Sequence, residues 1–323
     1  MSKNDTLRAA VIGGGHIAQL HLAVLRDLPG VDVCALVDRD PKALEETGDR
    51  FEIPTRLGDC ADLLEGERPD AAFVLVSVPE VAAVAGAFLA AGIPTFLEKP
   101  PGLYTSQTRG LAELARRHNT PAMVGVNRRF YSNLSSGREL LLEAGPIQSV
   151  TVEAHEDLNR VRINPKFPDE VLRRWSAANG IHALDLLRFY GGDIADIAAT
   201  QHTVEGPMPD CCSAVLRFEG GAMGRALMDW YAPGGHRVEA RSVGATFTSA
   251  LGAAATLRRC GEEPETLEWD EIDRQYKPGF YRQHETFVRC VREDRSFPYP
   301  ACTLDDAVKT MEMIDAISGT GGC

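Results

Sequence analysis

The stretch Leu7-Arg-Ala-Ala-Val-Ile-Gly13-Gly-Gly15-His16-Ile17-Ala18 decides the fold that the rest of the chain is expected to adopt. Its first six residues are a short apolar run typical of a buried strand, and a helical pattern follows the glycines. Glycines permit a tight turn with close backbone approach, and a helix N-terminus favours an anionic group. We therefore predict a phosphate-binding turn between a strand and a helix, formed by Gly13, Gly15, His16 and Ile17.

A second signal follows at the expected distance. The strand-like run over residues 31–37 ends at Asp38, twenty residues beyond Ala18. A dinucleotide-binding fold places an acid there on the adenosine ribose. Its carboxylate would repel a 2′-phosphate, because a like-charge contact at about 4 Å costs on the order of 1–4 kcal/mol. This favours NAD over NADP, although Arg39 could stack on adenine or offset a phosphate, so NADP stays possible.

Strand and helix patterns alternate through the first 126 residues, which predicts a doubly wound parallel sheet. The continuous apolar run at 71–76 suits a strand covered on both faces. It ends before Ser77 and Pro79, which we expect near the ribose side of the cofactor, with a plain helix-starting turn as the alternative.

The run over residues 93–97 ends at Glu98-Lys99-Pro100, so a buried strand delivers a charged group at the sheet edge. Within a nucleotide-binding sheet, Lys99 is the residue that a substrate and a nicotinamide ring would both meet. Taken alone, the tripeptide favours a surface lysine just past a strand end. The glycine turn and Asp38 favour the functional interpretation.

Composition limits the other possibilities. The 323 residues suit two domains, and 34 basic against 46 acidic residues give a net charge of −12, which opposes nonspecific nucleic-acid binding. No apolar run approaches the roughly 18 residues of a membrane span. The eight cysteines include no Cys-x-x-Cys pair, and we expect free thiols in a cytoplasmic protein without a signal peptide.

The second half of the sequence has a different pattern, in which strands follow one another. Alternating strands are predicted near residues 150–156, 214–218, 223–230, 238–248 and 255–259, with few helices between them. Helices are predicted over 281–293 and 304–317, the latter capped by Thr303. We place the domain boundary at residues 125/126, with a dinucleotide-binding domain over 1–125 and a substrate-binding and oligomerisation domain over 126–323.

Four motifs in this order resemble the Gfo/Idh/MocA family of sugar and polyol oxidoreductases. They are the glycine turn, Glu98-Lys99-Pro100, the run Val124-Gly-Val-Asn127-Arg-Arg-Phe130, and Gly180-Ile-His182-Ala-Leu-Asp185-Leu-Leu-Arg188. The resemblance implies a Rossmann domain followed by an α/β domain with a large, mostly antiparallel sheet. It further implies cofactor contacts at Glu98 and Asn127, a homodimer or homotetramer formed through that sheet, and a polyol or sugar substrate.

The resemblance also implies a catalytic histidine at His182. The family usually carries an aspartate four residues earlier, where this chain has Ala178. This departure removes one proton-handling or substrate-orienting carboxylate. Asn179 lies next to it, but nothing in the sequence assigns it as a substitute.

Oxidation of a secondary alcohol needs hydride transfer to nicotinamide together with loss of the hydroxyl proton. His182 suits the proton acceptor because its reference pKa, about 6.5, lies near working pH. Lys99 would bind the reacting oxygen, and Asp185 would orient His182 or bind a substrate hydroxyl. The alternative is a nicotinamide-dinucleotide-binding sensor or regulatory protein that turns nothing over, which the loss at Ala178 would favour.

Further candidates are weaker. Tyr131, Arg160 and Arg162 lie just past the cofactor domain, or in the irregular stretch that follows it, and are expected on the substrate side. His155, Glu156 and Asp157 raise the question of a metal, but a strand would place only His155 and Asp157 on one face. We expect a solvated strand end and no metal there. Trp175 and Trp230 are expected to be packing residues.

Overall fold

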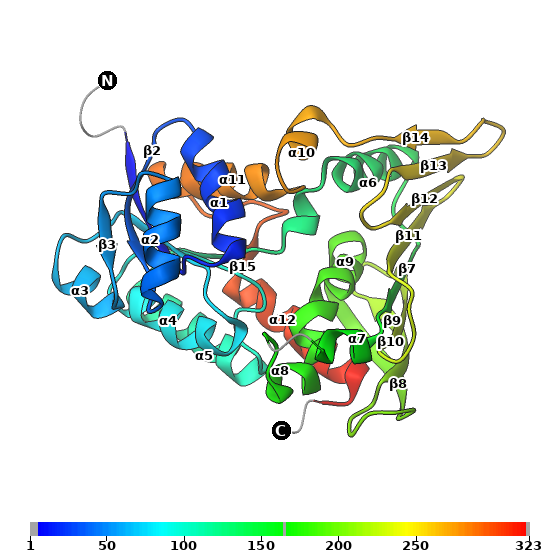
Figure 1. The fold of residues 1–323 in the computed structure, drawn as a ribbon. Helices are drawn as coiled ribbons and strands as arrows, with labels where there is room; N and C mark the ends of the chain where they lie inside the picture. The colour runs from blue at the N-terminus through cyan, green and yellow to red at the C-terminus, as the bar shows by residue number, and fades with distance from the viewer. Residues whose placement is uncertain (1–5, 164–165, 321–323) are drawn as a thin grey trace. The chain divides into compact units, whose positions relative to one another are not determined.

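The computed structural model describes residues 6–163 and 166–320, so Cys323 lies outside the described residues. The chain divides into two compact units (Figure 1). The first contains residues up to Gly102, Ser106–Asn127 and Ile272–Ala307. The second contains Leu103–Thr105, Arg128–Glu271 and the chain from Val308 onward.

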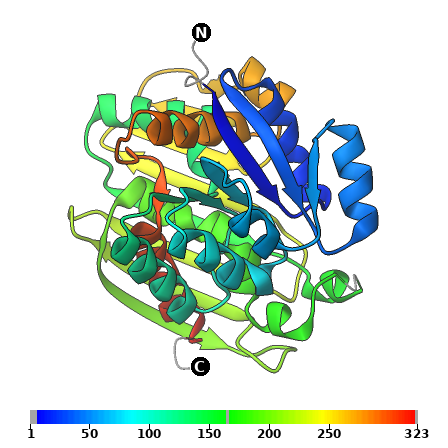
Figure 2. The same cartoon turned by 90° about the vertical axis from the view of Figure 1, so that its left-hand side faces the viewer.

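The first unit is built on a seven-stranded sheet whose order is β3-β2-β1-β4-β5-β6-β15. All neighbours pair in parallel except the short last strand, which pairs antiparallel with β6. Figure 2 shows β1 and β2 side by side in dark blue. The strands are β1 (Leu7–Ile12), β2 (Val31–Val37), β3 (Thr55–Leu57), β4 (Ala71–Val74), β5 (Thr95–Leu97), β6 (Ala122–Val124) and β15 (Cys302–Thr303).

The predicted alternation of strands and helices is confirmed in this unit. Strands β4 and β1 are buried along almost their whole length, as expected when both faces of a parallel sheet are covered. The phenyl rings of Phe73 and Phe96, on adjacent strands, contact Phe287 of α11 with centroid distances of 5.2 and 5.7 Å. The helices are α1 (His16–Asp27), α2 (Pro41–Arg50), α3 (Cys60–Glu65), α4 (Val78–Ala90), α5 (Thr105–His118), α10 (Glu271–Gln275) and α11 (Phe280–Arg292).

Short polar side chains cap two helix starts, at Asp40 and, as predicted, at Thr303. The Asp40 side chain accepts a hydrogen bond from the backbone N–H of Lys42 at 3.0 Å, with Pro41 in the first turn of α2. Thr303 Oγ1 accepts from the N–H of Asp306 at 3.2 Å, where α12 begins. These short polar side chains satisfy N–H groups that have no partner within the helix.

The second unit is built on an eight-stranded sheet of order β14-β13-β12-β11-β7-β10-β9-β8. Only the central β7–β10 pair is parallel, so the predicted mostly antiparallel sheet is confirmed. A hairpin at Glu219-Gly220-Gly221 joins β9 and β10. The strands are β7 (Ser149–His155), β8 (Ile194–His202), β9 (Cys211–Phe218), β10 (Met223–Asp229), β11 (His236–Ser242), β12 (Ala245–Ala250), β13 (Ala255–Arg259) and β14 (Glu265–Leu267).

One face of this sheet is covered by helices. Helix α9 packs on β7, β10 and β11, while α6 packs on β11 to β14. Burial therefore alternates along β9 and β10, because every second side chain points away from the helices. The other elements are the 3₁₀ turn η1 (Asn127–Phe130), α6 (Ser132–Ala144), α7 (Leu158–Arg162), α8 (Asp169–Arg173), the π turn η2 (Ser176–Gly180), α9 (Ile181–Gly191) and α12 (Leu304–Ser318).

The predicted boundary at residues 125/126 differs from the observed division in one respect. The chain does leave the first unit close to that point, at Asn127. It returns over Ile272–Ala307, which supplies α11 and β15 to the first unit. Amphipathic α11 buries Phe280, His284 and Phe287 among the aromatic side chains of that unit, so a single cut in the sequence does not describe the fold.

Candidate functional site

The turn after β1 requires glycine at its first position. Gly13 has φ +105°, a conformation that other residues rarely adopt. A Cβ atom placed there would lie 2.6 Å from the carbonyl oxygen of Leu75. The turn is tied to the sheet through the Gly13 N–H, which donates to Val37 O at 2.8 Å. Backbone packing against β2 and β4 thus explains the first glycine of the motif.

The glycine at the second motif position has no such packing reason. Gly15 has φ −71°, which any residue can adopt, and a Cβ there would meet no atom within 4 Å. It is the N-cap of α1, whose first turn, beginning at His16 and Ile17, contains no acidic residue. The open space and the positive end of the helix dipole together suit a pyrophosphate held against backbone N–H groups. These residues therefore fit the predicted dinucleotide.

Asp38 lies beside the same turn. Its carboxylate accepts hydrogen bonds from the N–H of Gly14 at 2.6 Å and of Asp40 at 2.8 Å. A carboxylate has about four lone-pair positions, so two acceptor positions remain for ribose hydroxyls. Asp38 thus stabilises the glycine turn while keeping the capacity to bind the ribose.

The sequence missed a partner for Arg39. The guanidinium of Arg39 forms an ion pair with Glu80, in the first turn of α4. The hydroxyl of Ser77, at the start of that helix, donates to Glu80 Oε2 at 2.6 Å, and Pro79 lies in the same turn. Arg39 is therefore drawn towards an acid, which reduces its ability to offset a 2′-phosphate.

A chain of buried polar side chains lies behind the end of β5. Glu98 Oε1 is 3.0 Å from His21 Nε2, and His21 Nδ1 is 2.7 Å from His284 Nε2. Both histidines are fully buried, and Glu98 is 8% exposed. His284 was not predicted, because it lies 263 residues from His21 and no spacing rule connects them.

The protonation states of Glu98, His21 and His284 follow from their burial and their hydrogen bonds. Burial pushes the pKa of His284 well below its ordinary value, and burial also lowers that of His21, which the bond to Glu98 only partly opposes. Burial would raise the pKa of Glu98, but the His21 bond and the nearby charges of Lys99 and Lys277 hold it below its usual range.

Glu98 is therefore ionised and accepts from His21 Nε2–H, so neutral His21 must accept at Nδ1 from His284 Nε2–H. His284 Nδ1 is then an acceptor, and it is buried without a hydrogen-bond partner in the described part of the chain. Each neutral imidazole ring donates one hydrogen bond. The hydrogen bonds therefore run in one direction, from His284 to His21 and from His21 to the Glu98 carboxylate, which lies next to Lys99 in sequence.

Two other predicted residues have well-defined surroundings. Lys99 is half-buried directly after β5, and its charge acts on Glu98. Asn127 is 2% exposed, and its amide donates to Pro278 O at 3.0 Å. The amide of Asn127 thus holds the backbone that precedes α11, next to Lys277, and its carbonyl oxygen remains an acceptor for a cofactor.

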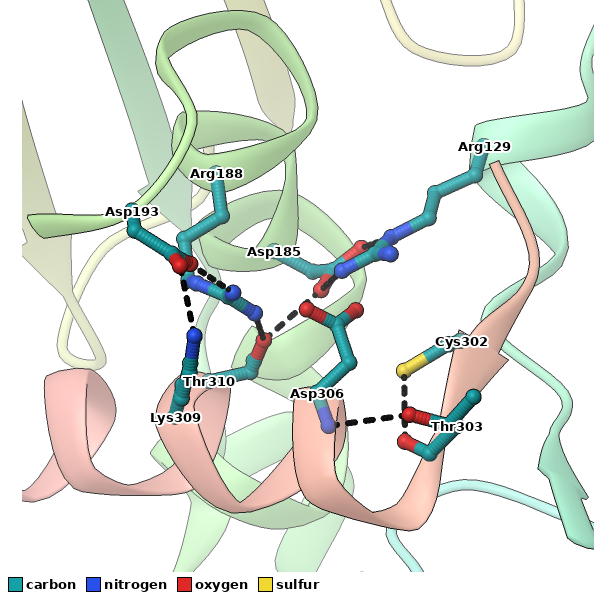
Figure 3. A network of polar contacts seen from close by, with 9 residues as sticks. All are labelled: Arg129, Asp185, Arg188, Asp193, Cys302, Thr303, Asp306, Lys309 and Thr310. Carbon is teal, nitrogen blue, oxygen red and sulfur yellow. Dashed lines mark hydrogen bonds and ion pairs between the residues drawn. The ribbon is translucent and has the colours of Figure 1, made fainter. Parts of the chain in front are cut away.

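In the second unit, Asp185 has a different role from the one expected. Its two carboxylate oxygens lie 2.6 and 2.7 Å from Arg129 Nε and Nη2, and Thr310 Oγ1 donates to it at 3.0 Å (Figure 3). Asp185 is only 2% exposed. A carboxylate so engaged and so buried fixes α9 against η1 and α12, and the geometry favours this structural role over contact with a substrate hydroxyl.

His182 is the second residue of α9 and is half-buried. Directly before α9 the helical path widens into the π turn at Ser176–Gly180. This wider turn changes the spacing between Ala178 and His182 that an uninterrupted α-helix would give. Such turns often occur at functional sites, where they redirect side chains.

The three predicted substrate residues do not gather at one place. Tyr131 packs against Trp269 with ring centroids 5.0 Å apart. Arg160 lines a cavity of about 680 Å³ together with Arg128, Glu156, Trp175 and Asn179. Arg162 lines a separate cavity of about 270 Å³. Arg160 therefore shares a cavity with Asn179, whereas Arg162 shares one with Ser176 at the start of the same π turn.

The strand end at His155-Glu156-Asp157 shows no metal-like arrangement. His155 Nδ1 lies 2.9 Å from Asp229 Oδ2, and the Asp157 side chain accepts from the N–H of Asn159 at the start of α7. Across residues 6–163 and 166–320, no three histidine, cysteine, aspartate or glutamate side chains are grouped as metal ligands would be. Over the same residues, no helix combines the length and apolar character needed to span a bilayer.

The parallel sheet, the glycine turn and the acid after β2 define a Rossmann-type dinucleotide-binding unit. Residues 7–126 match the model described as "Oxidoreductase family, NAD-binding Rossmann fold", and residues 144–248 match that of the "GFO/IDH/MocA C-terminal domain". The chain belongs to the Gfo/Idh/MocA family of oxidoreductases.

Relatives agree with this assignment. D-apiose dehydrogenase of Paraburkholderia graminis is 27% identical over 225 residues, which cover 66% of this chain. This chain spans 58% of the length of that relative. Trans-1,2-dihydrobenzene-1,2-diol dehydrogenase of Mus musculus is 26% identical over 68% of this chain and 67% of its own. The crystal structure of GenD2 from gentamicin A biosynthesis, in complex with NAD, is 25% identical with a TM-score of 0.75, covering 98% of this chain and 94% of that one.

The two motif glycines should respond differently to alanine. Gly13→Ala should lower the free energy of unfolding by about 1–3 kcal/mol or more, because of its positive φ and the contact with Leu75 O. Gly15→Ala should change it by less than about 0.5 kcal/mol. Its methyl group would occupy the open space, so NADH affinity should fall about tenfold or more. Urea unfolding and NADH fluorescence titration measure the two effects, and wild-type NADH affinity in Gly15→Ala would contradict the phosphate site.

The buried histidines predict a pH dependence of stability. Their pKa values are lowered in the folded protein, so the unfolded chain takes up protons first and stability is lost as pH falls below about 6.5. Each histidine contributes up to about 1.4 kcal/mol per pH unit. Above about pH 5 the carboxylates stay ionised, because their reference pKa values are lower, so they do not contribute to the change in stability between about pH 5 and 6.5. In His284→Gln the unfolding free energy, measured by urea denaturation, should fall less steeply across this window.

His118, which is exposed on α5, provides the control for this measurement. Replacement by glutamine there should keep the wild-type slope, because the side chain is surrounded by water in both the folded and the unfolded chain. A slope in His284→Gln equal to that of wild type would show that His284 is not the buried neutral group described above.

Proposed function

We propose that this protein is an NAD(P)-dependent oxidoreductase that transfers a hydride between nicotinamide and a hydroxyl or ketone carbon of a sugar, inositol or related polyol. The observation that carries the proposal is the end of β5, where an ionised, buried Glu98 is fixed by two histidines directly before Lys99. A cation at the edge of a dinucleotide-binding sheet suits a reacting oxygen. The names of the relatives, an apiose and a dihydrodiol dehydrogenase, support the same substrate class.

The proposed chemistry divides between two side chains. Bound NAD accepts the hydride from the carbinol carbon. Lys99 would donate a hydrogen bond to the carbinol oxygen and stabilise the negative charge that develops on it. His182 would accept the hydroxyl proton in the oxidation direction and return it in the reduction direction. Asp185 would act indirectly, since its ion pair with Arg129 holds α9, the helix that carries His182.

NAD is the proposed cofactor, with NADP as the alternative. The free acceptor positions of Asp38 suit the hydroxyls of an unmodified ribose, and its charge opposes a 2′-phosphate. The only side chain next to Asp38 in sequence that could offset a phosphate is Arg39, which pairs with Glu80. Both features support NAD, while Gly15, His16, Ile17, Ser77 and Pro79 are proposed to line the phosphates and ribose.

A cytoplasmic location is proposed on the state of the cysteines. All seven cysteines in the described part of the chain are free thiols. Burial raises the pKa of Cys34 and Cys290, which keeps both thiols protonated and unreactive. Free thiols persist in a reducing compartment.

The second candidate is a nucleotide-binding sensor or regulatory protein without turnover. One observation favours it, which is alanine at position 178 in place of the family's usual aspartate. Both candidates bind a nicotinamide dinucleotide through the first unit. They differ in whether substrate is converted, so a kinetic test separates them.

For the oxidoreductase, Lys99→Met and His182→Ala should each lower kcat by about 10²–10⁴-fold, because each removes a group that acts on the reacting oxygen or its proton. NADH formation at 340 nm with D-apiose, myo-inositol, levoglucosan and trans-1,2-dihydrobenzene-1,2-diol measures activity. NAD affinity should change little in either variant. The matched controls are Lys42→Met and His202→Ala, whose side chains lie exposed on α2 and at the end of β8.

Two other results are informative in this experiment. NAD binding without conversion of any of the four compounds would favour the sensor. Failure to bind NAD or NADP would contradict both candidates.

We also propose that the uncovered face of the second sheet contacts a further copy of the chain. Val215, Met223 and Leu227 are 50%, 41% and 42% exposed on this face of β9 and β10. Leu227→Glu should therefore reduce the mass measured by analytical ultracentrifugation to that of one chain. Val243→Glu, in the turn between β11 and β12, is the control and should leave the mass unchanged. A monomeric wild-type protein would contradict the proposal.

A further inference from the structure

A carboxylate from a strand end contacts the π turn that contains Ala178. Glu156 directly follows β7, and its Oε2 accepts hydrogen bonds from Trp175 Nε1 at 2.7 Å and from Asn179 Nδ2 at 2.8 Å. Asn179 is the neighbour of Ala178 in the π turn. The π turn that contains Ala178 is therefore in contact, through Asn179, with a carboxylate supplied by a segment more than twenty residues away in sequence.

The surrounding protein holds this carboxylate in place. The backbone N–H of Glu156 donates to Asp229 O at 2.9 Å, which anchors it to β10. Trp175 is 5% exposed, and its ring packs edge-on against Phe167 with centroids 5.3 Å apart. Both side-chain donors reach Glu156 from the segment that leads into α9. The carboxylate is thus fixed on two sides before any ligand arrives.

Glu156 also has free acceptor capacity towards a cavity. Both recorded side-chain bonds go to Oε2, and within the described part of the chain Oε1 is left to accept from another donor. Glu156, Trp175 and Asn179 line the cavity of about 680 Å³, together with Arg128 and Arg160. Burial lowers the pKa of Arg128, and the charges of Tyr131 and Glu156 oppose this effect, so Arg128 and Glu156 act on each other within the cavity wall.

We propose that Glu156 replaces the missing carboxylate at position 178 and accepts a hydrogen bond from a hydroxyl of the substrate. Asn179 and Trp175 are positioning residues, since they act by fixing Glu156. The inference rests on the proposed polyol oxidoreductase activity and defines the substrate more closely. It requires a hydroxyl that donates to Glu156, with a neighbouring oxygen that can accept from Arg128.

The central test is to remove the negative charge at position 156 and then to place a carboxylate at position 178. Glu156→Gln keeps the shape of the side chain and an oxygen for Trp175 and Asn179, but weakens the acceptor. We expect kcat/KM for the most active of the four polyols tested above to fall about 10- to 100-fold, the range for a hydrogen bond to a charged group. Ala178→Asp added to Glu156→Gln should recover at least about tenfold of this loss.

Two further measurements separate a substrate role from a structural one. NADH affinity and the melting temperature of Glu156→Gln should match those of wild type, because Glu156 lies outside the dinucleotide-binding unit. Glu205→Gln is the control: this glutamate accepts a bond from Asn159 at 2.9 Å, is exposed, and should have wild-type kcat/KM.

Each outcome decides the matter. Loss of kcat/KM with recovery by Ala178→Asp supports the proposal. Wild-type kcat/KM in Glu156→Gln overturns it, as does a loss that the second carboxylate does not restore or that a lower melting temperature accompanies. If wild type binds NADH but converts none of the polyols, the proposed function fails, and this inference fails with it.

Discussion

The hydrogen bond between His21 and the buried carboxylate of Glu98 is the interaction on which the dinucleotide-binding unit depends. It joins α1, which follows the glycine turn, to the end of β5, which leads into Lys99. His284 extends it to α11, a helix from the returning segment of the chain. Removing one member would leave a buried charge or polar atom unsatisfied, at a cost of about 1–3 kcal/mol or more. The turn, the lysine and the returning helix are thus coupled by one polar chain.

The second unit uses the same physical principle with a different pair of groups. Arg129 and Asp185 are both buried and form a bidentate pair, and Thr310 satisfies a further acceptor position (Figure 3). Breaking a buried pair of this kind by removing one partner typically costs about 3–5 kcal/mol, since the other charge is left uncompensated. Near the end of α9, the buried Arg188 pairs with Asp193, a partly exposed residue just beyond the helix that also pairs with Lys309 of α12. The helix that carries His182 is therefore held by charges on its buried side.

These networks explain which features could be predicted from the sequence. The strands and the caps at Asp40 and Thr303 depend on neighbours within a few residues, so local patterns contain the information. The glycine turn was predicted from its motif, although the atoms that require glycine at position 13 belong to distant strands. His284 and Glu80 depend on partners brought together by the fold, and no local pattern identifies them. For Asp185 the spacing from His182 is helical, but spacing alone does not reveal the arginine that occupies its carboxylate. The return of Ile272–Ala307 to the first unit likewise has no local signal.

The position of Glu156 bears on whether the alanine at position 178 argues for a protein without turnover. A carboxylate carried on the helix would move with the π turn, whereas one at the end of β7 is fixed by a sheet and contacts that turn only through Asn179 and Trp175. Loss of a side chain at one position implies loss of function only if no other segment presents the same chemical group to the same space. If Glu156 accepts a substrate hydroxyl as proposed, a different element supplies the carboxylate, and the alanine at position 178 no longer favours a protein without turnover. Under this proposal, Ala178 indicates a change in the direction from which the substrate is held.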